Sequence, residues 1–322
     1  MPDFDGMRPF RFLASTGDVV DARTLAGHAR HVESLGYSAI VIPDHLLDQL
    51  APIPALAVLA GATERLRIAT FVLNNDLRHP AVLAQDLATL DVLSDGRLEI
   101  GIGAGWNAAQ FAAIGIAFEP VGTRVSRLEE AVAVLKGLFA DDPFSFAGTF
   151  YTLTEADGRP KPVQRPHPPL LIGGGGRRLL SLAGREADIV GLAPRIRWGS
   201  GPARVDPRSL TVDAASEKLE WVRQAAGARF DALEINVYPS QFPSVITDHA
   251  RAEATERAAA LSARSGIAIS ADELIASPHQ YLGTVEALCD KLVGLRERLG
   301  ISCFMLGDAD AMAPVVERLA GR

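Results

Sequence analysis

Short apolar runs alternate along this chain with longer segments in which apolar residues recur at helical spacing. The short runs predict eight strands, and most of them are continuously apolar, which is typical of parallel strands buried on both faces. We expect these strands near residues 10–14, 38–42, 67–73, 97–102, 170–173, 188–192, 233–238 and 302–306.

The longer segments predict helices that follow the strands. We expect the helices near residues 21–35, 52–64, 80–93, 124–138, 177–187, 212–228, 246–265 and 285–299, with a short terminal helix at 311–319. Gly36 and Gly300 follow two of these helices, where a left-handed residue commonly ends a helix, and Thr284 can cap the start of the second. Eight successive βα units predict an α/β fold, a single (β/α)8 TIM barrel domain over residues 1–322. An open, doubly wound sheet is the alternative.

Two segments do not fit the βα repeat. Residues 141–168 contain a hairpin-like pattern at 144–151 and a proline-rich return, and residues 194–210 are rich in Arg, Pro and Gly. We expect both segments to be excursions, after the fourth and the sixth βα units.

The run from Asp95 to Trp106 is the most specific pattern in the chain. It predicts a tight turn, a buried strand and a strand end with alternate glycines at positions 101, 103 and 105. Such glycines leave one face without side chains, so a flat ring could approach the backbone closely. Two other predicted strands end in Pro43-Asp44-His45 and in four glycines at 173–176.

Together these segments resemble the luciferase-like flavin and deazaflavin oxidoreductases. The resemblance rests on Asp44-His45, on Arg78-His79-Pro80-Ala81, on the block from Leu90 to Trp106 and on the glycine run, in that order. It covers nearly the whole chain, from about Phe10 to about Leu319.

The resemblance implies an active centre at the carboxyl ends of the strands. His45 would face the redox ring and donate or accept a proton during hydride transfer, which histidine does near neutral pH. The alternative is a local role, in which Asp44 caps the next turn and His45 is an ordinary polar residue. Members of the family also bend the backbone after the third strand, often through a non-prolyl cis peptide, which we expect at Phe71-Val72. The residues implied to contact the cofactor here are Asp44, Phe71, Val72, Asn74, Asn75, Gly103, Gly105 and Trp106.

The glycine run predicts a site for the cofactor's phosphate, because free amides at a helix start bind anions. It comprises Gly173, Gly174, Gly175 and Gly176, followed by Arg177. It is not a Walker loop, since no Lys-Ser/Thr pair follows it. A purely structural turn is the alternative.

The resemblance leaves two cofactors open, FMN and the deazaflavin F420. The segment from residue 177 to 208 carries seven arginines against three acidic residues, which suits the acidic oligoglutamate tail of F420; a solvated surface is the other interpretation. We therefore favour an F420-dependent oxidoreductase that transfers a hydride between the cofactor and a small, unsaturated organic substrate. The alternatives are an FMN-dependent monooxygenase that uses O2 and a barrel that binds a flavin without turnover.

One departure from the family pattern bears on the substrate. The sugar-phosphate dehydrogenases of the family place a Glu just after the fourth strand and a Trp shortly after the histidine of strand two. Trp106 and, roughly, Gln49 occupy these places here. This difference disfavours a sugar phosphate and favours an apolar or planar substrate.

Bulk properties narrow the partners further. A net charge of -7 and the absence of a long basic run argue against nucleic acid. We find no signal-peptide pattern and no apolar stretch long enough to cross a membrane, so we expect a cytoplasmic protein. We also expect a homodimer, no metal site, and reduced thiols at Cys289 and Cys303.

Overall fold

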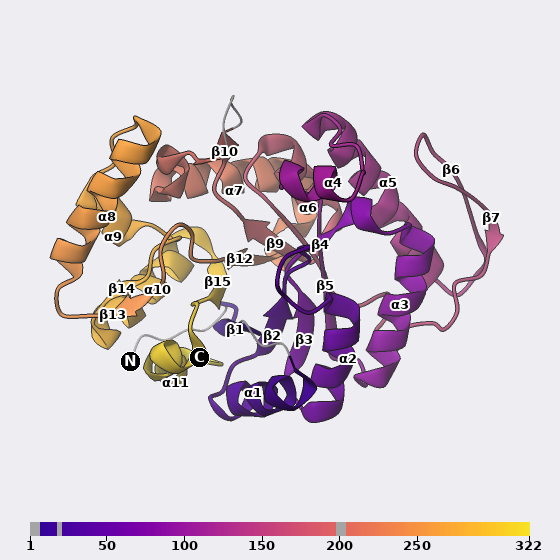
Figure 1. Ribbon diagram of the computed structural model, residues 1–322, viewed down its shortest axis with the longest axis horizontal. Coiled ribbons are helices and arrows are strands. Elements are labelled where there is room, and N and C mark those ends of the chain that lie inside the picture. Colours follow the sequence, from indigo (N-terminus) through magenta and orange to yellow (C-terminus); the bar gives the residue numbers. More distant parts are fainter. Residues whose placement is uncertain (1–6, 18–20, 198–203) are drawn as a thin grey trace. The chain divides into compact units, whose positions relative to one another are not determined.

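A computed structural model describes residues 7–17, 21–197 and 204–322 of the chain (Figure 1). Contacts divide the chain into two compact units, which we name by their place in the sequence. The central unit comprises Thr16–His31 and Ala39–Ile172, and the terminal unit comprises Met1–Ser15, Val32–Ser38 and Gly173–Arg322. Each unit is described by itself below.

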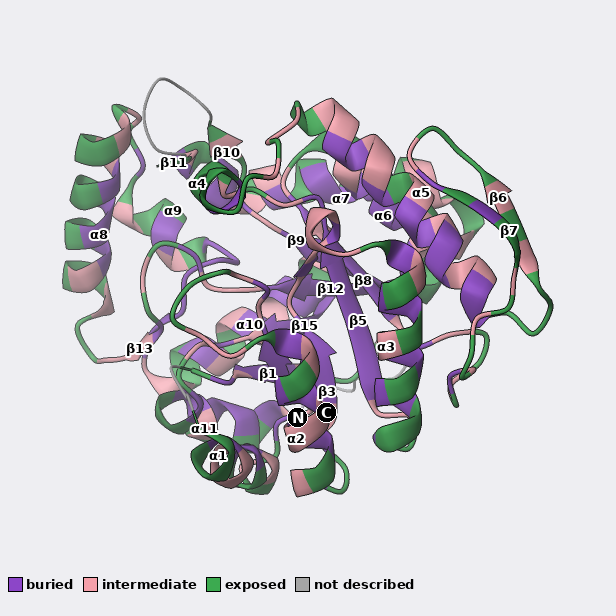
Figure 2. Cartoon of the chain, turned by 45° about the vertical axis from the view of Figure 1, so that its right-hand side comes forward, coloured by how far each residue is buried: buried purple, intermediate pink, exposed green. Residues whose placement is uncertain are grey.

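The central unit is built on parallel strands that follow one another in the order β2, β3, β5 and β8, with the short β4 beside β5. Every residue of β2 and β5 is buried, and β5 is purple along its length in Figure 2. The strands are β2 (Ala39–Ile42), β3 (Arg67–Thr70), β4 (Leu73–Asn74), β5 (Leu98–Gly103) and β8 (Leu170–Gly174), whose last two residues belong to the terminal unit.

The helices of the central unit follow its strands in the chain. They are α1 (Ala22–Ser34), whose end belongs to the terminal unit, α2 (Pro52–Ala62), the 3-10 turn η1 (Asn75–Leu77), α3 (Pro80–Leu93), α4 (Ala108–Ala113) and α5 (Val121–Phe139). A hairpin of β6 (Phe144–Ala147) and β7 (Thr152–Ala156) lies beside α5 (Figure 1). Glu130 of α5 accepts three backbone N–H groups from the hairpin turn, which holds the hairpin on the helix.

The terminal unit has parallel strands in the order β1, β15, β12 and β9. They are β1 (Arg11–Ser15), β9 (Ile189–Leu192), β12 (Glu234–Val237) and β15 (Ile301–Met305). Its helices are α6 (Arg177–Glu186), α7 (Val212–Ala226), α8 (Ala250–Ser265), α9 (Ala271–Ala276), α10 (Val285–Leu299) and α11 (Ala309–Leu319), with 3-10 turns η2 (Pro207–Leu210) and η3 (Gly227–Ala232). Short strand pairs join β10 (Ile196–Arg197) to β11 (Arg204–Val205) and β13 (Val245–Ile246) to β14 (Leu282–Gly283).

Four strands in each unit, each followed by a helix, make the eight βα repeats of a (β/α)8 barrel, which confirms the predicted fold class. The predicted capping also holds. Gly36 and Gly300 have φ of +85° and +67°, and the Thr284 hydroxyl accepts the Ala287 N–H at the start of α10. The hairpin is present, but its second strand begins later than expected, at Thr152.

The excursions differ from the prediction in two respects. The arginine-rich segment at 194–210, of which residues 198–203 lie outside the described chain, comes between β9 and α7 and so falls within the sixth unit. A further excursion, which we did not predict, separates β12 from α10. It contains α8 and α9, which share a small buried cluster with η2 made by Leu210, Ala258, Leu261, Ile269 and Leu274.

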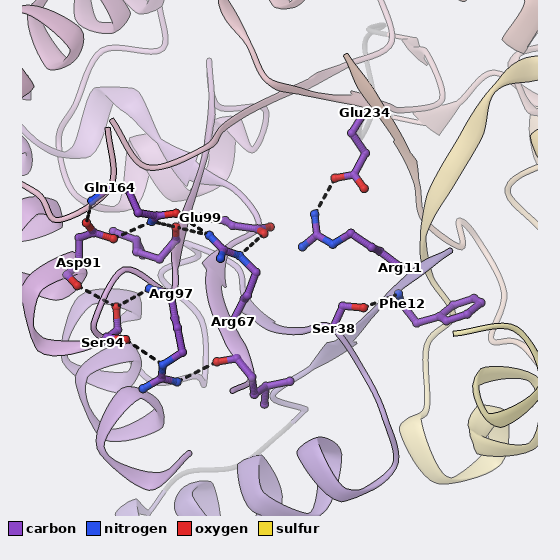
Figure 3. A network of polar contacts seen from close by, with 12 residues as sticks. Arg11, Phe12, Ser38, Arg67, Asp91, Ser94, Arg97, Glu99, Gln164 and Glu234 are labelled. Atoms are coloured by element: carbon purple, nitrogen blue, oxygen red, sulfur yellow. Dashed lines mark hydrogen bonds and ion pairs between the residues drawn. The ribbon is translucent and has the colours of Figure 1, made fainter. Parts of the chain in front are cut away.

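The contacts of Arg97 account for the Ser-Asp-Gly-Arg run that precedes β5 (Figure 3). Ser94 ends α3, and the next two residues turn the chain with positive φ, at +53° and +74°. The Arg97 guanidinium then donates to the carbonyl oxygens of Ser94, Leu66 and Ala60 at 2.8 Å each. It therefore joins the ends of α2 and α3 to the start of β5.

A second network secures the proline-rich return that precedes β8 (Figure 3). The Gln164 side chain and backbone N–H donate to the Asp91 carboxylate of α3, at 2.7 and 2.9 Å. The Gln164 amide oxygen accepts Arg67 Nη2 at 2.9 Å, and Arg67 also pairs with Glu99 at the start of β5. These contacts hold the amino-terminal ends of the strands in register.

We predict that Arg97→Ala lowers the free energy of unfolding by about 2–4 kcal/mol, because several buried carbonyl acceptors lose a charged donor at once. Denaturant titration followed by circular dichroism measures this change. Arg298→Ala, at an exposed position of α10, is the matched control and should cost less than about 0.5 kcal/mol. Equal stabilities of the two variants would contradict the assigned role.

Candidate active site

Asp44 fastens the carboxyl end of β2 to the segment that follows β3. Its carboxylate is buried and receives two hydrogen bonds from Arg78, at 2.6 and 3.1 Å. It also accepts the backbone N–H of Asn74 at 3.0 Å. Asp44 therefore positions β4, and its predicted contact with a cofactor stays a prediction.

The backbone between β3 and β4 bends as expected, with a cis peptide at Phe71-Val72, which confirms the predicted irregularity. The Thr70 hydroxyl lies 2.8 Å from both the N–H and the carbonyl oxygen of Gly101, so it can accept from one and donate to the other. Phe71 and Val72 remain half-buried at this bend, where a ligand can reach them.

The alternate glycines of β5 are needed for a different reason from the one that the sequence suggested. A Cβ at Gly101 would lie 2.1 Å from the Thr70 carbonyl oxygen, and one at Gly103 would lie 2.9 Å from Val72 Cγ2. The space that we expected to receive a flat ring is thus filled by the chain's own bend. The glycines allow β5 and the bend to approach closely.

Gly105 and Arg124 shape the exit from β5. Gly105 has a φ of +71°, and a Cβ there would lie 2.7 Å from Asn74 Oδ1. The buried Arg124 of α5 donates to the Ala104 carbonyl at 3.1 Å and to that of Glu119, and its guanidinium covers the Phe118 ring at 3.9 Å. Burial lowers the pKa of Arg124 below its ordinary value, while the Asp76 carboxylate raises it. The exit that carries Trp106 is therefore firmly held.

His45 lies beside two residues of this exit. Its Nδ1 is 3.2 Å from Gln110 Oε1 on α4, and its ring meets the Trp106 ring edge-on, with centroids 5.8 Å apart. Trp106 is 48% exposed, and the neighbouring Leu46 and Leu47 are 50% and 63% exposed. The imidazole thus meets one buried amide and one aromatic ring that is itself about half exposed. Gln110 was missed from the sequence, where it is 65 residues away from its partner.

The two asparagines after the bend differ in exposure. Asn74 is half-buried, and its side chain accepts the Asp76 N–H at 3.2 Å. Asn75 is buried, and its amide donates to the Tyr151 hydroxyl at 3.4 Å. Burial raises the pKa of Tyr151 above its ordinary value, although the hydrogen bond from Asn75 lowers it. Asn74 is therefore the better placed of the two for a ligand, and Asn75 braces the bend against the hairpin.

In the terminal unit, the glycine run lies where β8 passes into α6. A Cβ at Gly174 would lie 2.6 Å from Leu179 Cδ2, and one at Gly175 would lie 2.5 Å from the Pro194 carbonyl oxygen. These two glycines are thus required by the protein itself. At Gly176, which precedes α6, a Cβ would meet nothing within 4 Å, and no side chain caps the helix. Gly176 and Arg177 are exposed, so the free N–H groups at this helix start are open to an anion.

Lys218 of α7 supports this turn from within. Its side chain is buried, and its ammonium donates to the carbonyl oxygens of Ala193 and Ser209, at 2.8 and 3.0 Å. Burial lowers the pKa of Lys218 to about 8, and the charge of Arg195 lowers it too. The Ala193 N–H in turn donates to the Gly174 carbonyl oxygen at 2.9 Å. Sequence reasoning missed Lys218, since lysines on amphipathic helices usually face solvent.

Within residues 7–17, 21–197 and 204–322, no group of three or more His, Cys, Asp or Glu side chains is arranged to hold a metal ion. No helix in the same part of the chain combines the length and the apolar character needed to cross a membrane.

Comparison with known proteins places this arrangement in a family. Residues 4–298 match the family model described as luciferase-like monooxygenase. The chain belongs to the luciferase-like monooxygenase family. A solved structure with this fold, the coenzyme F420-dependent tetrahydromethanopterin reductase of Methanopyrus kandleri, superposes with a TM-score of 0.75 at 18% identity, over 97% of this chain and 99% of that one.

Curated relatives of this luciferase-like protein use different cofactors. An FMNH2-dependent dimethylsulfone monooxygenase of Pseudomonas putida is 38% identical over 130 residues, which are 40% of this chain and 36% of that protein. An F420-dependent glucose-6-phosphate dehydrogenase of Microbacterium testaceum is 34% identical over 164 residues, 48% of each protein. These matches span half of the relatives' length or less, and the two relatives use different cofactors, so they do not fix the cofactor of this chain.

For this luciferase-like protein we predict that Asp44→Asn lowers the free energy of unfolding by about 1–3 kcal/mol. Breaking a fully buried ion pair costs roughly 3–5 kcal/mol, but the Arg78 side chain is 25% exposed and water compensates part of the loss. Thermal and denaturant unfolding measure the change. The control is Asp48→Asn, at a nearby exposed carboxylate, and an Asp44 variant as stable as this control would refute the anchoring role.

Proposed function

We propose that the protein is an F420-dependent oxidoreductase that transfers a hydride between the deazaflavin and a small, unsaturated organic substrate. The observation that carries the proposal is the uncapped start of α6, where exposed Gly176 and Arg177 offer amides and a cation to an anionic group. F420 has a phosphodiester and an acidic tail, and the F420-dependent relatives are consistent with this choice.

Each unit, taken by itself, has residues that suit one part of such a cofactor. In the central unit, Phe71, Val72, Asn74 and Trp106 would bind the ring from the exposed side of the bend and of the β5 exit. Gly103 and Gly105 would contribute by leaving room for Val72 and Asn74. In the terminal unit, Gly176 and Arg177 would bind the phosphodiester, while Gly173, Gly174 and Gly175 hold the shape of the turn. When bound, a deazaflavin supplies a ring carbon that accepts or returns a hydride. His45 would hold or release the accompanying proton at its Nε2 atom.

The surface around His45 favours an apolar substrate. Trp106, Leu46 and Leu47 are large side chains that remain about half exposed or more. The residue at this point of the β5 exit is Trp106, which carries no charge. A homodimer is also part of the proposal, and α3 exposes Val82 and Leu93, apolar residues that a partner subunit would cover.

An FMN-dependent monooxygenase is the second candidate, and the Pseudomonas relative favours it. FMN carries a phosphate but no acidic tail, so the two candidates differ in their electrostatics. Binding experiments can therefore separate them.

We predict that the protein binds oxidised F420 more tightly than FMN. Added salt should weaken the binding of F420 more than the binding of FMN. Fluorescence quenching at matched concentrations measures both affinities. Gly176→Val should weaken intact F420 but not a tail-less deazaflavin, since a side chain there meets solvent or ligand and not the protein. Micromolar binding of FMN with no detectable binding of F420 would reverse the assignment.

We predict that His45→Ala lowers turnover about 10²-fold or more while cofactor affinity stays within a few-fold, as for loss of a general acid or base. Steady-state kinetics and direct binding measure the two quantities separately. His249→Ala, at an exposed position before α8, serves as the control. An unchanged rate in His45→Ala at saturating substrate and cofactor would leave His45 with a structural role only, and cofactor binding without any turnover would favour a non-catalytic barrel.

A further inference from the structure

Among the residues that the structure describes, the Gln110 side chain makes one hydrogen bond, and its partner is His45. The Gln110 carbonyl oxygen lies 3.2 Å from His45 Nδ1. A carbonyl oxygen can only accept, so Nδ1 must carry the proton that joins the two groups. In a neutral imidazole the other nitrogen, Nε2, then holds a bare lone pair.

We propose that Gln110 is a positioning residue that fixes the tautomer of His45, with the proton on Nδ1 and with Nε2 left as the atom that exchanges a proton with the substrate. The inference deepens the proposed function, because it rests on His45 as the acid or base of that reaction. It adds a residue whose effect passes through His45 and which needs no contact with substrate or cofactor.

The helix that carries Gln110 is well anchored. Gln110 is itself 8% exposed, and Asn107 caps α4 by accepting the Ala109 N–H at 3.2 Å. The next residue, Phe111, is 1% exposed and packs edge-on against Phe118, with ring centroids 5.0 Å apart. Because α4 is held in this way, the amide keeps one orientation relative to the imidazole.

The nitrogen of the Gln110 amide makes an unfavourable contribution to the free energy of folding. Gln110 Nε2 is buried and has no hydrogen-bond partner within residues 7–17, 21–197 and 204–322. Buried donors without partners are unfavourable, and an apolar residue such as leucine would leave none. The favourable contact of this side chain is therefore the one with His45, which is what a positioning role requires.

Trp106 restrains the same ring from another side. Its indole meets the imidazole at an interplanar angle of 86°, so rotation of His45 about its side-chain bonds would disturb this packing. Gln110 and Trp106 together hold the ring in one orientation and one tautomer. Neutral His45 can then accept a proton only at Nε2, and the imidazolium can return a proton from the same atom.

The test is nitrogen NMR of the full chain labelled at histidine, without cofactor, at a pH where His45 is neutral. His45→Ala identifies the signal. In the wild-type protein we expect a protonated Nδ1 and an unprotonated Nε2. Gln110→Glu offers only acceptor oxygens and should keep this pattern, whereas Gln110→Leu should lose it, with the proton moving at least partly to Nε2. Gln85→Leu, at an exposed position of α3, should change nothing.

Two outcomes would overturn the proposal. A wild-type proton on Nε2 that moves to Nδ1 in Gln110→Glu would mean that the amide nitrogen faces His45 and donates to it. An unchanged pattern in Gln110→Leu would mean that the ring's surroundings, and not Gln110, set the tautomer.

Kinetics provide a second readout in a protein that turns over. Gln110→Leu should lower kcat about tenfold at unchanged cofactor affinity, and Gln110→Glu should restore most of the rate. The added carboxylate favours the imidazolium, so the acidic limb of the pH–rate profile should move to higher pH in Gln110→Glu. Because the NMR pattern needs no bound cofactor, failure of the F420 assignment and failure of the Gln110 proposal are distinguishable.

Discussion

The close approach of β5 to the bend after β3 is the constraint on which the candidate site depends. Gly101 and Gly103 leave room for Thr70 and Val72, and any side chain at these two positions would collide with the bend. Once the bend is seated, Asn74 reaches the Asp44 carboxylate and contacts the outer side of Gly105. The same packing therefore sets the positions of β4, of the β5 exit and of Trp106.

Charged side chains that donate to backbone carbonyls stabilise the irregular segments in both units. Arg97 joins the ends of two helices, Arg124 holds the β5 exit, and Lys218 holds the loop behind the glycine run. Carbonyl oxygens in loops lack the hydrogen bonds that strands and helices provide. One buried cation with several N–H groups can donate to two or three of them at once. These contacts fix local geometry, and burial of the cation opposes them, as the lowered pKa of Lys218 shows.

The regular elements were predictable because their signals are local. Strands buried on both faces read as continuous apolar runs, and α3 and α10 begin and end at the expected residues because Pro80, Thr284 and Gly300 mark their boundaries. α4 is too short for a helical period to show. α9 carried a usable signal, since Ser270 and Glu273 form a capping box that the sequence spells out.

The candidate site was predictable only in part. Asp44, His45 and the cis peptide followed from the family resemblance, whereas Gln110 and Lys218 act through contacts between residues far apart in the chain. The glycines of β5 were correctly singled out for the wrong physical reason. An alternate-glycine pattern shows that something approaches the backbone, and only the fold shows that this partner is another segment of the same chain.

The contacts of the arginine-rich segment bear in the same way on the choice of cofactor. Arg195 pairs with Glu217 and stacks on Trp221, and Arg204 donates to the Arg264 carbonyl, so part of the positive charge counted in the sequence already has partners within the protein. The amides at the start of α6 would donate hydrogen bonds to the phosphate of either candidate cofactor, because they recognise an anionic oxygen and nothing else. Under the proposed function, discrimination between F420 and FMN would then come from the exposed cations near that helix start, Arg177 first among them. In the terminal unit it is therefore the charge of the cofactor's tail, and not the structure of its ring, that these residues can distinguish.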